Sequence, residues 1–426
     1  MENSPRADGK GVTVIQPIKQ DDSCWRTRFQ MLFYGVSCVL FWSVFIMQLP
    51  FIAPYFGGVK VMFYVSMVYG LSSNISRIVL MVMHNRSSGK VSSRIHRLVY
   101  LGASVTALGM FLFPVCMGIL STTHPTISFW LCLLITAIVG AFNSLLVTGG
   151  FALMSLAPNG SGQFFLIGFT LTGIITWPFI VSLRVICETA GTSGESTTLI
   201  VSIISLSITG VLCLLSIPMY RYKTSQNPYF ITQIEREGDA IIGGGSRSGI
   251  LPVFRKIWSI VLSLWSSRVV TFALYPGLIG LWTPHGSIPF TKSLYQSFLL
   301  YLGPVSDTVG QLVFRFTPLG NRLLLGERSL TILTIIRAII LIPLFLLSAY
   351  FDDTNSVIAQ DWLRVLLMFM FSFSMGINYS LGNALAPAKF ESPDDKYTVG
   401  VLLSFVAMNG LFVGSLVGIG FKELLM

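Results

Sequence analysis

The chain has 426 residues, of which 53% are hydrophobic and only 11% are charged, and its mean hydropathy is +0.73. A typical soluble domain is about 25% charged, so this composition excludes an ordinary water-soluble protein. A soluble core could not hide so much apolar surface, and a lipid bilayer is the solvent that fits it. The net charge of +10 is explained by basic residues that fix membrane topology and meet anionic lipid, and nucleic acid is not expected as a partner.

Apolar runs long enough to cross a bilayer recur along the whole chain. Each span needs roughly 20 mostly apolar residues to cross about 30 Å of hydrocarbon. The first run begins near Phe29 without a clear small-residue cleavage site, which predicts a retained span rather than a signal peptide. Eleven spans are expected, at 29–52, 61–83, 98–119, 127–156, 163–186, 197–220, 257–280, 293–316, 329–350, 362–387 and 397–421.

The distribution of basic residues predicts the orientation of these spans. If the N-terminus is cytoplasmic, 20 of the 28 Lys and Arg residues fall in cytoplasmic segments, three fall outside and five lie within spans. This asymmetry agrees with the positive-inside rule and puts the C-terminus outside the cell. The sequence therefore predicts an all-α polytopic protein in a 6+5 major-facilitator-like arrangement. Its expected parts are a disordered cytoplasmic tail at 1–28, a six-helix bundle at 29–220, a cytoplasmic linker at 221–256 and a five-helix bundle at 257–426.

Several kinds of chemistry have no support in the sequence. The glycine run at 243–245 lacks the Lys-Ser/Thr ending of a phosphate loop, so nucleotide binding there is not expected. The six cysteines form no CxxC pair and the four histidines are scattered, which predicts neither a disulfide framework nor a metal site. No constellation of catalytic residues occurs at matching depths, so an intramembrane enzyme is the least expected function. No cofactor is expected.

Asp307 is the only acidic residue deep inside an expected span. Burying a charge in the bilayer costs at least ~2.5–3.5 kcal/mol, so such a residue normally faces the bundle interior or a cavity. Arg337, in the next span, lies at the same depth, roughly 10–12 Å from the cytoplasmic end. Gln311 follows Asp307 by four residues and shares its helix face. These positions predict a buried Asp307–Arg337 ion pair, which either only locks two helices together or lies beside a polar solute path.

Two further polar or aromatic positions lie within spans. Arg268, near mid-depth, precedes Tyr275-Pro276-Gly277, where the helix should break and free its carbonyl groups. Arg268 therefore either faces a cavity, with Tyr275 near it, or pairs with a carbonyl. Trp42 is mid-span rather than interfacial, and its ring either stacks on a planar solute or only fills space between packed helices. The glycines at 410, 414 and 418 share one helix face and predict close helix packing.

Several segments occur in an order that matches a known family. They are Leu40-Phe41-Trp42-Ser43, the Tyr-Pro pair at 275–276, Asp-Thr-Val-Gly-Gln at 307–311, Arg337 followed by Pro-Leu at 343–344, and Phe-Ser-Phe-Ser-Met-Gly at 371–376. They resemble motifs of the equilibrative nucleoside transporter family, including L-P-W-N, D-x-x-G-R and F-x-F-S-N-G. The departures from these motifs are those of a divergent member, of the kind expected in a protozoan.

The resemblance implies a carrier of nucleosides or nucleobases, purines favoured, that works by alternating access in the plasma membrane. It carries Trp42, Asp307 and Arg337 over as substrate-binding residues. Gln311 stands at the motif position where the family has an arginine that contacts the ribose. Asn143 is one of two candidates, with Val147, for the family's fourth-span glutamine. Facilitated diffusion is implied, with proton coupling left open.

The combined hypothesis gives each residue a role. Trp42 stacks on the base, Asp307 and Gln311 hydrogen-bond the sugar, and Arg337 orients Asp307. Two other functions stay open on sequence alone: a major-facilitator-like transporter of another small polar solute such as a sugar, and a non-transporting receptor or scaffold. The sequence sets neither the oligomeric state nor the preference between purines and pyrimidines.

Overall fold

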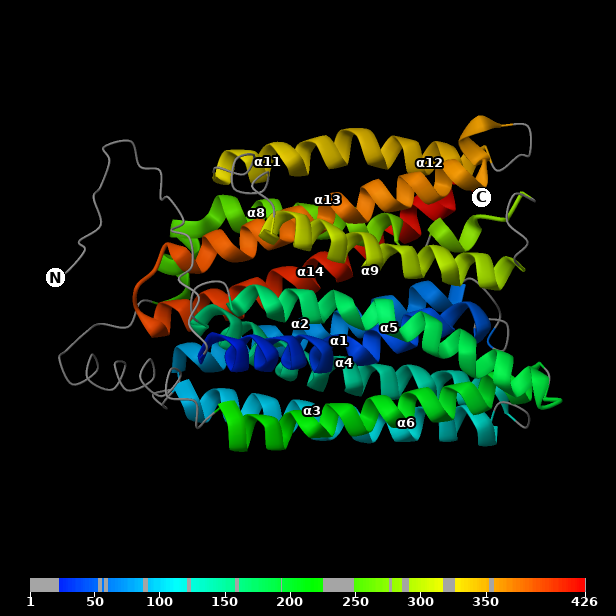
Figure 1. Ribbon diagram of the computed structural model, residues 1–426, viewed down its shortest axis with the longest axis horizontal. Coiled ribbons are helices and arrows are strands. Elements are labelled where there is room, and N and C mark those ends of the chain that lie inside the picture. The colour runs from blue at the N-terminus through cyan, green and yellow to red at the C-terminus, as the bar shows by residue number, and fades with distance from the viewer. Residues whose placement is uncertain are drawn as a thin grey trace.

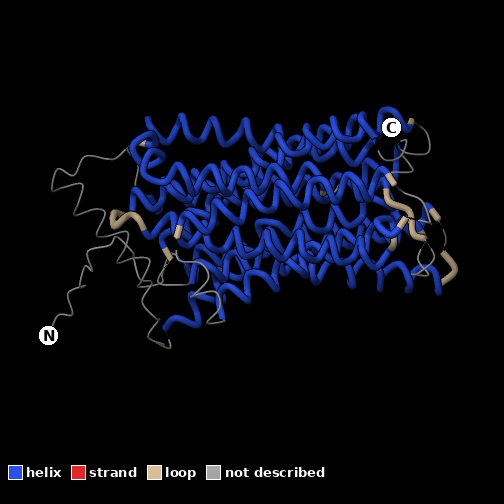
Figure 2. Tube along the Cα trace, turned by 90° about the horizontal axis from the view of Figure 1, so that it is seen from above, coloured by secondary structure: helices blue, strands red, loops and turns tan. Residues whose placement is uncertain are grey.

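The computed structural model describes residues 23–52, 56, 60–86, 91–120, 124–157, 161–192, 194–224, 249–275, 278–285, 291–316, 326–351 and 356–425. Every regular element among them is helical, and the long helices run side by side along the long axis of the molecule (Figure 1, Figure 2). Most of the expected tail and of the expected linker, at 1–22 and 225–248, lies outside the described residues.

The first half of the chain forms the helices drawn in the lower part of Figure 1. Helix α1 packs chiefly on α5, while α4 packs on α2 and α3, and α3 also packs on α6. Pro125 begins α4, where its missing N–H and fixed φ suit the first turn. The helices are α1 Ser23–Ile52, α2 Lys60–Arg86, α3 Val91–Leu120, α4 Pro125–Leu156, α5 Ser161–Thr189 and α6 Glu195–Met219, followed by a π-helical turn at Tyr220–Thr224.

The second half forms the helices drawn in the upper part of Figure 1. Helix α9 packs on α13 and α8 on α14, which also contacts α2 and α4 of the first half. A Cβ on Gly414 would lie 2.6 Å from the Val269 carbonyl oxygen, and one on Gly418 would lie 2.7 Å from that of Ala273. The predicted glycine contact is confirmed and joins α14 to α8. The helices are α8 Ile250–Leu274, α9 Lys292–Phe316, α11 Glu327–Ile336, α12 Ile342–Tyr350, α13 Asp361–Ala388 and α14 Pro393–Leu425, with short 3₁₀ turns η3 at Leu278–Leu281 and η5 at Val357–Ala359.

Helices α11 and α12 are joined by a π-helical turn, η4, at Arg337–Leu341. Pro343 cannot donate the bond that a regular helix would give to the carbonyl of Ile339, and a π-turn accommodates such a loss. Across this turn Arg337 is buried, with 1% of its surface exposed, while Ile339 is 69% exposed. Arg337 therefore faces the interior of the bundle, and Ile339 faces outward.

Ten helical segments in the described part of the chain are long and apolar enough to cross a membrane. They coincide with ten of the eleven expected spans and confirm a multi-span helical protein. The expected span at 293–316 coincides with α9, which is not among the ten. That helix carries Gln296, Asp307 and Gln311 in its interior, and these polar residues lower its hydropathy. The eleventh span stays a prediction.

Candidate functional site

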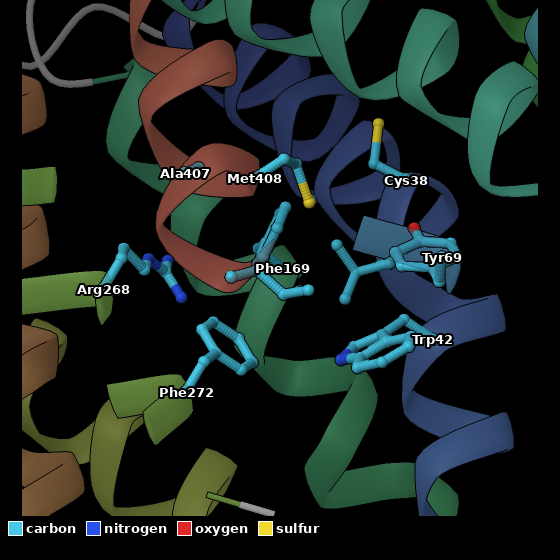
Figure 3. Close-up of a pocket in the computed structure, with 10 residues that line it drawn as sticks. Cys38, Trp42, Tyr69, Phe169, Arg268, Phe272, Ala407 and Met408 are labelled. Carbon is cyan, nitrogen blue, oxygen red and sulfur yellow. The ribbon is translucent and has the colours of Figure 1, made fainter. Parts of the chain in front are cut away.

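A cavity of about 110 Å³ lies between the two groups of helices, and we call it the central cavity. Side chains of α1, α5, α8, α9 and α13 line it. A smaller pocket of about 30 Å³ lies next to it and shares Trp42, Phe169, Arg268 and Phe272 with it. Figure 3 shows this side pocket, to which α14 also contributes residues. Helices from both halves of the chain therefore meet around one space.

Four of the seven residues predicted from the sequence line the central cavity: Trp42, Arg268, Tyr275 and Asp307. Tyr275 is in extended conformation just beyond the end of α8, with φ −111° and ψ 131°, as is typical before a proline. The predicted break itself, at 276–277, lies outside the described residues. The Tyr275 hydroxyl donates a hydrogen bond to the Leu300 carbonyl at 3.1 Å, which ties the end of α8 to α9.

The Trp42 indole is held by an aromatic partner. It stacks on Tyr69 with ring centroids 4.6 Å apart and an interplanar angle of 21°. The Asn143 amide donates to the Tyr69 hydroxyl at 2.8 Å and to the Cys38 carbonyl at 3.1 Å. Asn143 is not among the residues that line the two pockets and lies behind Tyr69. Its contacts fix the orientation of Tyr69 and thereby that of Trp42, and its role as a substrate contact stays a prediction.

The Asp307 carboxylate accepts a hydrogen bond from the Gln311 amide at 2.9 Å. The side chains four residues apart on α9 thus meet as expected. Helix α13 comes very close here, because a Cβ on Gly376 would lie 2.1 Å from the Asp307 carbonyl oxygen and 2.8 Å from its carboxylate. Gly376 is therefore the residue that lets α13 pack against the acidic side of the cavity.

The expected direct ion pair between Asp307 and Arg337 is wrong. Within the described residues no ion pair joins them, and Arg337 instead donates to the hydroxyls of Ser374 at 3.3 Å and Thr271 at 3.1 Å. Its guanidinium also lies over the ring of Phe371, 5.0 Å from the centroid. Equal depth in two neighbouring helices does not fix the rotation of either one, and Arg337 faces α8 and α13.

Arg268 is the basic residue that lines both pockets. Its side chain is buried, with 8% exposed, and the guanidinium lies 3.9 Å from the centroid of the Tyr379 ring. It lines the central cavity together with Asp307. The basic residue that shares the cavity with the acid is thus Arg268, which the sequence predicted either to face a cavity or to pair with a carbonyl.

Sequence reasoning missed several lining residues, among them Phe169 and Thr170 on α5 and Phe272 on α8. Hydroxyl pairs join the helices around the cavity: Thr170 accepts from Thr308 at 2.7 Å, and Ser43 and Thr172 are 2.7 Å apart. Phe and Thr are frequent throughout these apolar helices, so nothing in the sequence distinguishes the few that line a cavity.

The two groups of helices touch on both sides of the cavity. At the end of the bundle where α1 begins, Arg94 forms an ion pair with Asp394 at 3.0 Å. Towards the opposite end, Trp177 of α5 stacks on Tyr301 of α9 with centroids 4.8 Å apart, and the Ser297 hydroxyl donates to the Met47 carbonyl at 3.3 Å. Contacts between the halves of the chain therefore lie towards each end of the bundle.

Solved structures with the same arrangement of helices are transporters. FucP, a major facilitator superfamily transporter in the outward conformation, has a TM-score of 0.52 with 16% identity, and the match covers 95% of this chain and 99% of FucP. This chain has the fold of a major facilitator transporter. The xylose transporter XylE from E. coli has a TM-score of 0.50 with 12% identity, over 94% of this chain and 97% of XylE. The nucleoside transporter NupG has a TM-score of 0.51 with 13% identity, over 93% of this chain and 91% of NupG.

The major facilitator fold and the ten apolar helical segments together make the chain a multi-pass membrane protein. No family model matches the sequence, and neither does any curated protein. At these identities the similarity to the three structures establishes the fold and leaves the solute undetermined. Among the described residues, no group of three or more His, Cys, Asp or Glu residues is placed to hold a metal ion.

Proposed function

We propose that this protein is a carrier of nucleosides and nucleobases, with purines favoured, that works by alternating access. The observation that carries the proposal is that Trp42 and Asp307 line one cavity between the two groups of helices. Stacking of a base on an aromatic side chain is worth about 1–3 kcal/mol. An ionised carboxylate accepts hydrogen bonds only, and those from hydroxyl groups are strong, which suits the paired hydroxyls of a ribose.

The neighbouring residues support these two roles. Tyr69 and Asn143 hold Trp42 from behind, and Gln311 holds Asp307 from the next turn of α9. Arg337 reaches the cavity through Thr271, to which it donates a hydrogen bond and which itself lines the cavity. In this proposal Trp42 binds the base, and Asp307 with Gln311 binds the sugar. Arg337 holds the Thr271 hydroxyl in place and supplies a positive charge near the cavity.

Alternating access requires contacts that close each side of the cavity in turn. We assign the Arg94–Asp394 contact to the cytoplasmic side and the Trp177–Tyr301 contact to the outer side. This assignment rests on a cytoplasmic N-terminus, eleven spans in a 6+5 arrangement and residence in the plasma membrane, which are parts of the same proposal. The 20-to-3 distribution of loop Lys and Arg residues supports the orientation.

The test is solute uptake by the purified protein in liposomes. Radiolabelled inosine, hypoxanthine and adenosine are each offered with unlabelled purines, pyrimidines or hexoses as competitors, at two external pH values. Saturable purine uptake that purines compete away supports the proposal, and a pH-independent rate supports facilitated diffusion. Absence of saturable purine uptake by protein that is correctly folded contradicts it.

A second candidate is a carrier of another small polar solute such as a sugar. The similarity in fold to the xylose transporter XylE favours it. It predicts that hexoses or pentoses, rather than purines, are taken up and compete. A receptor or scaffold would give no flux of either class, so the same liposome experiment separates all three functions.

A further inference from the structure

The Arg268 guanidinium is a buried hydrogen-bond donor without an acidic partner. Within the described residues it forms no ion pair, and its Nε atom has no hydrogen-bond partner. The side chain is more than nine-tenths buried and lines both pockets. In Figure 3 it points into the pocket from α8, with Trp42 on the far side. The group is therefore directed at the space where a solute would lie.

A guanidinium in this position sets a requirement on the solute. Arginine donates hydrogen bonds and accepts none. A buried donor left without an acceptor is costly, roughly 1–3 kcal/mol and more for a charged group. The guanidinium lies over the Tyr379 ring, and its Nε–H group is left without an acceptor. A solute that presents acceptor atoms to Arg268 is favoured, and a solute that presents an N–H group there is disfavoured.

Purines differ at the edge that such an arginine reads. In 6-oxopurines such as guanine and hypoxanthine, O6 and N7 are two adjacent acceptors, which match the two parallel N–H groups of a guanidinium. In adenine the N7 acceptor stands next to an N6 amino group, which donates. A base stacked on Trp42 lies in the same space that Arg268 faces, so its acceptor edge can meet the guanidinium.

We propose that Arg268 makes this carrier selective for 6-oxopurines, as free bases and as nucleosides, over 6-aminopurines. The proposal rests on the proposed function and names its substrate class. It gives Arg268 a role that differs from that of Asp307, because Arg268 reads the base while Asp307 holds the sugar. The wild-type protein then takes up inosine and hypoxanthine with a kcat/KM about 10- to 100-fold higher than adenosine and adenine, the range expected for one bidentate contact.

The decisive variant is Arg268→Gln. A glutamine amide both donates and accepts, so it pairs with N6 and N7 of adenine. The expected result is a fall of about 10-fold or more in kcat/KM for inosine together with unchanged or higher uptake of adenosine, so that the preference reverses. Arg268→Lys keeps the charge and loses the planar guanidinium. Its preference for inosine over adenosine should lie between those of the wild-type and Arg268→Gln proteins. Arg255→Gln, on the exposed face of the same helix, is the control and should keep the wild-type preference.

Equal wild-type kcat/KM for inosine and adenosine would overturn this proposal while leaving a nucleoside carrier in place. So would an equal fall for both substrates in Arg268→Gln protein that reaches the membrane at normal amounts. Absence of all purine uptake by the wild-type protein would overturn the proposed function as well. If Arg268→Gln does not fold, the thermal stability of wild-type protein decides: hypoxanthine must raise the Tm and adenine at the same concentration must raise it less, and equal shifts overturn the proposal.

Discussion

Replacing Asp307 by Asn tests whether its carboxylate holds the sugar of a nucleoside. The substitution keeps the shape of the side chain and an oxygen that can still accept from Gln311, whose amide lies 2.9 Å from the carboxylate. It removes the negative charge. Hydrogen bonds to a charged group contribute about 1.5–3 kcal/mol, and neutral ones are about half as strong.

For two ribose hydroxyls the expected loss is therefore about 1.5–3 kcal/mol. This corresponds to a fall of roughly 10- to 150-fold in affinity for a nucleoside. Hypoxanthine has no sugar, so its uptake should fall far less than that of inosine. The assay is the concentration dependence of inosine and hypoxanthine uptake by wild-type and Asp307→Asn protein in liposomes, with the amount of inserted protein measured for each.

Comparing inosine with hypoxanthine distinguishes a role of Asp307 in binding the sugar from a role in stabilising the helix bundle. If Asp307 only stabilises the bundle, for instance by offsetting the charges of Arg268 and Arg337, both uptakes fall together. An equal loss for inosine and hypoxanthine, or no loss for either, would refute the assignment of Asp307 to the sugar.

Substitutions at three further places test the stacking residue, the close helix contact and the contact at the end of the bundle. Trp42→Ala should lower affinity for every purine by roughly 5- to 150-fold, as expected for one lost stacking contact, and Trp42→Phe should lower it less. Affinity is measured by competition. If Trp42→Ala protein binds purines as tightly as wild-type protein, stacking on Trp42 is excluded. Gly376→Ala should reduce uptake strongly, because a Cβ 2.1 Å from the Asp307 carbonyl oxygen forces α13 away from α9, and a wild-type rate would contradict this. Arg94→Ala and Asp394→Ala should each alter the rate of uptake. The reversed pair, Arg94→Asp with Asp394→Arg, should restore that rate. A reversed pair that transports no better than either single variant would argue against the contact.

The spans could be predicted because a bilayer imposes a length and a polarity on each helix. The expected run at 29–52 ends where α1 ends, at Ile52, although the helix begins six residues earlier, at Ser23. Hydropathy detects the part of a helix that is apolar and says little about where the helix itself starts. The same dependence explains α9, whose interior polar residues lower its hydropathy and keep it out of the set of ten.

The site could be predicted only in part, because depth along a helix is visible in a sequence and rotation about its axis is not. Asp307 stands out as a charge deep inside an expected span, and it does line the cavity. Arg337 lies at the expected depth, yet it contacts Thr271 and Ser374 instead of Asp307. Asn143, chosen by resemblance, lines neither pocket and instead donates to Tyr69 and Cys38, which line the side pocket.

Helix α14 determines where the moving boundary of the proposed carrier lies. Its glycine face is fixed to α8, with backbone groups so close that no side chain fits between them. Its largest contacts with the first half of the chain are with α2 and α4, and they include a hydrogen bond between the hydroxyls of Thr148 and Ser404 at 3.1 Å. If the two groups of helices rock, α8 and α14 travel as one body, and the sliding surface runs along the side of α14 that faces α2 and α4. A covalent link between α8 and α14 should then leave transport running, whereas a link from α14 to α4 should arrest it.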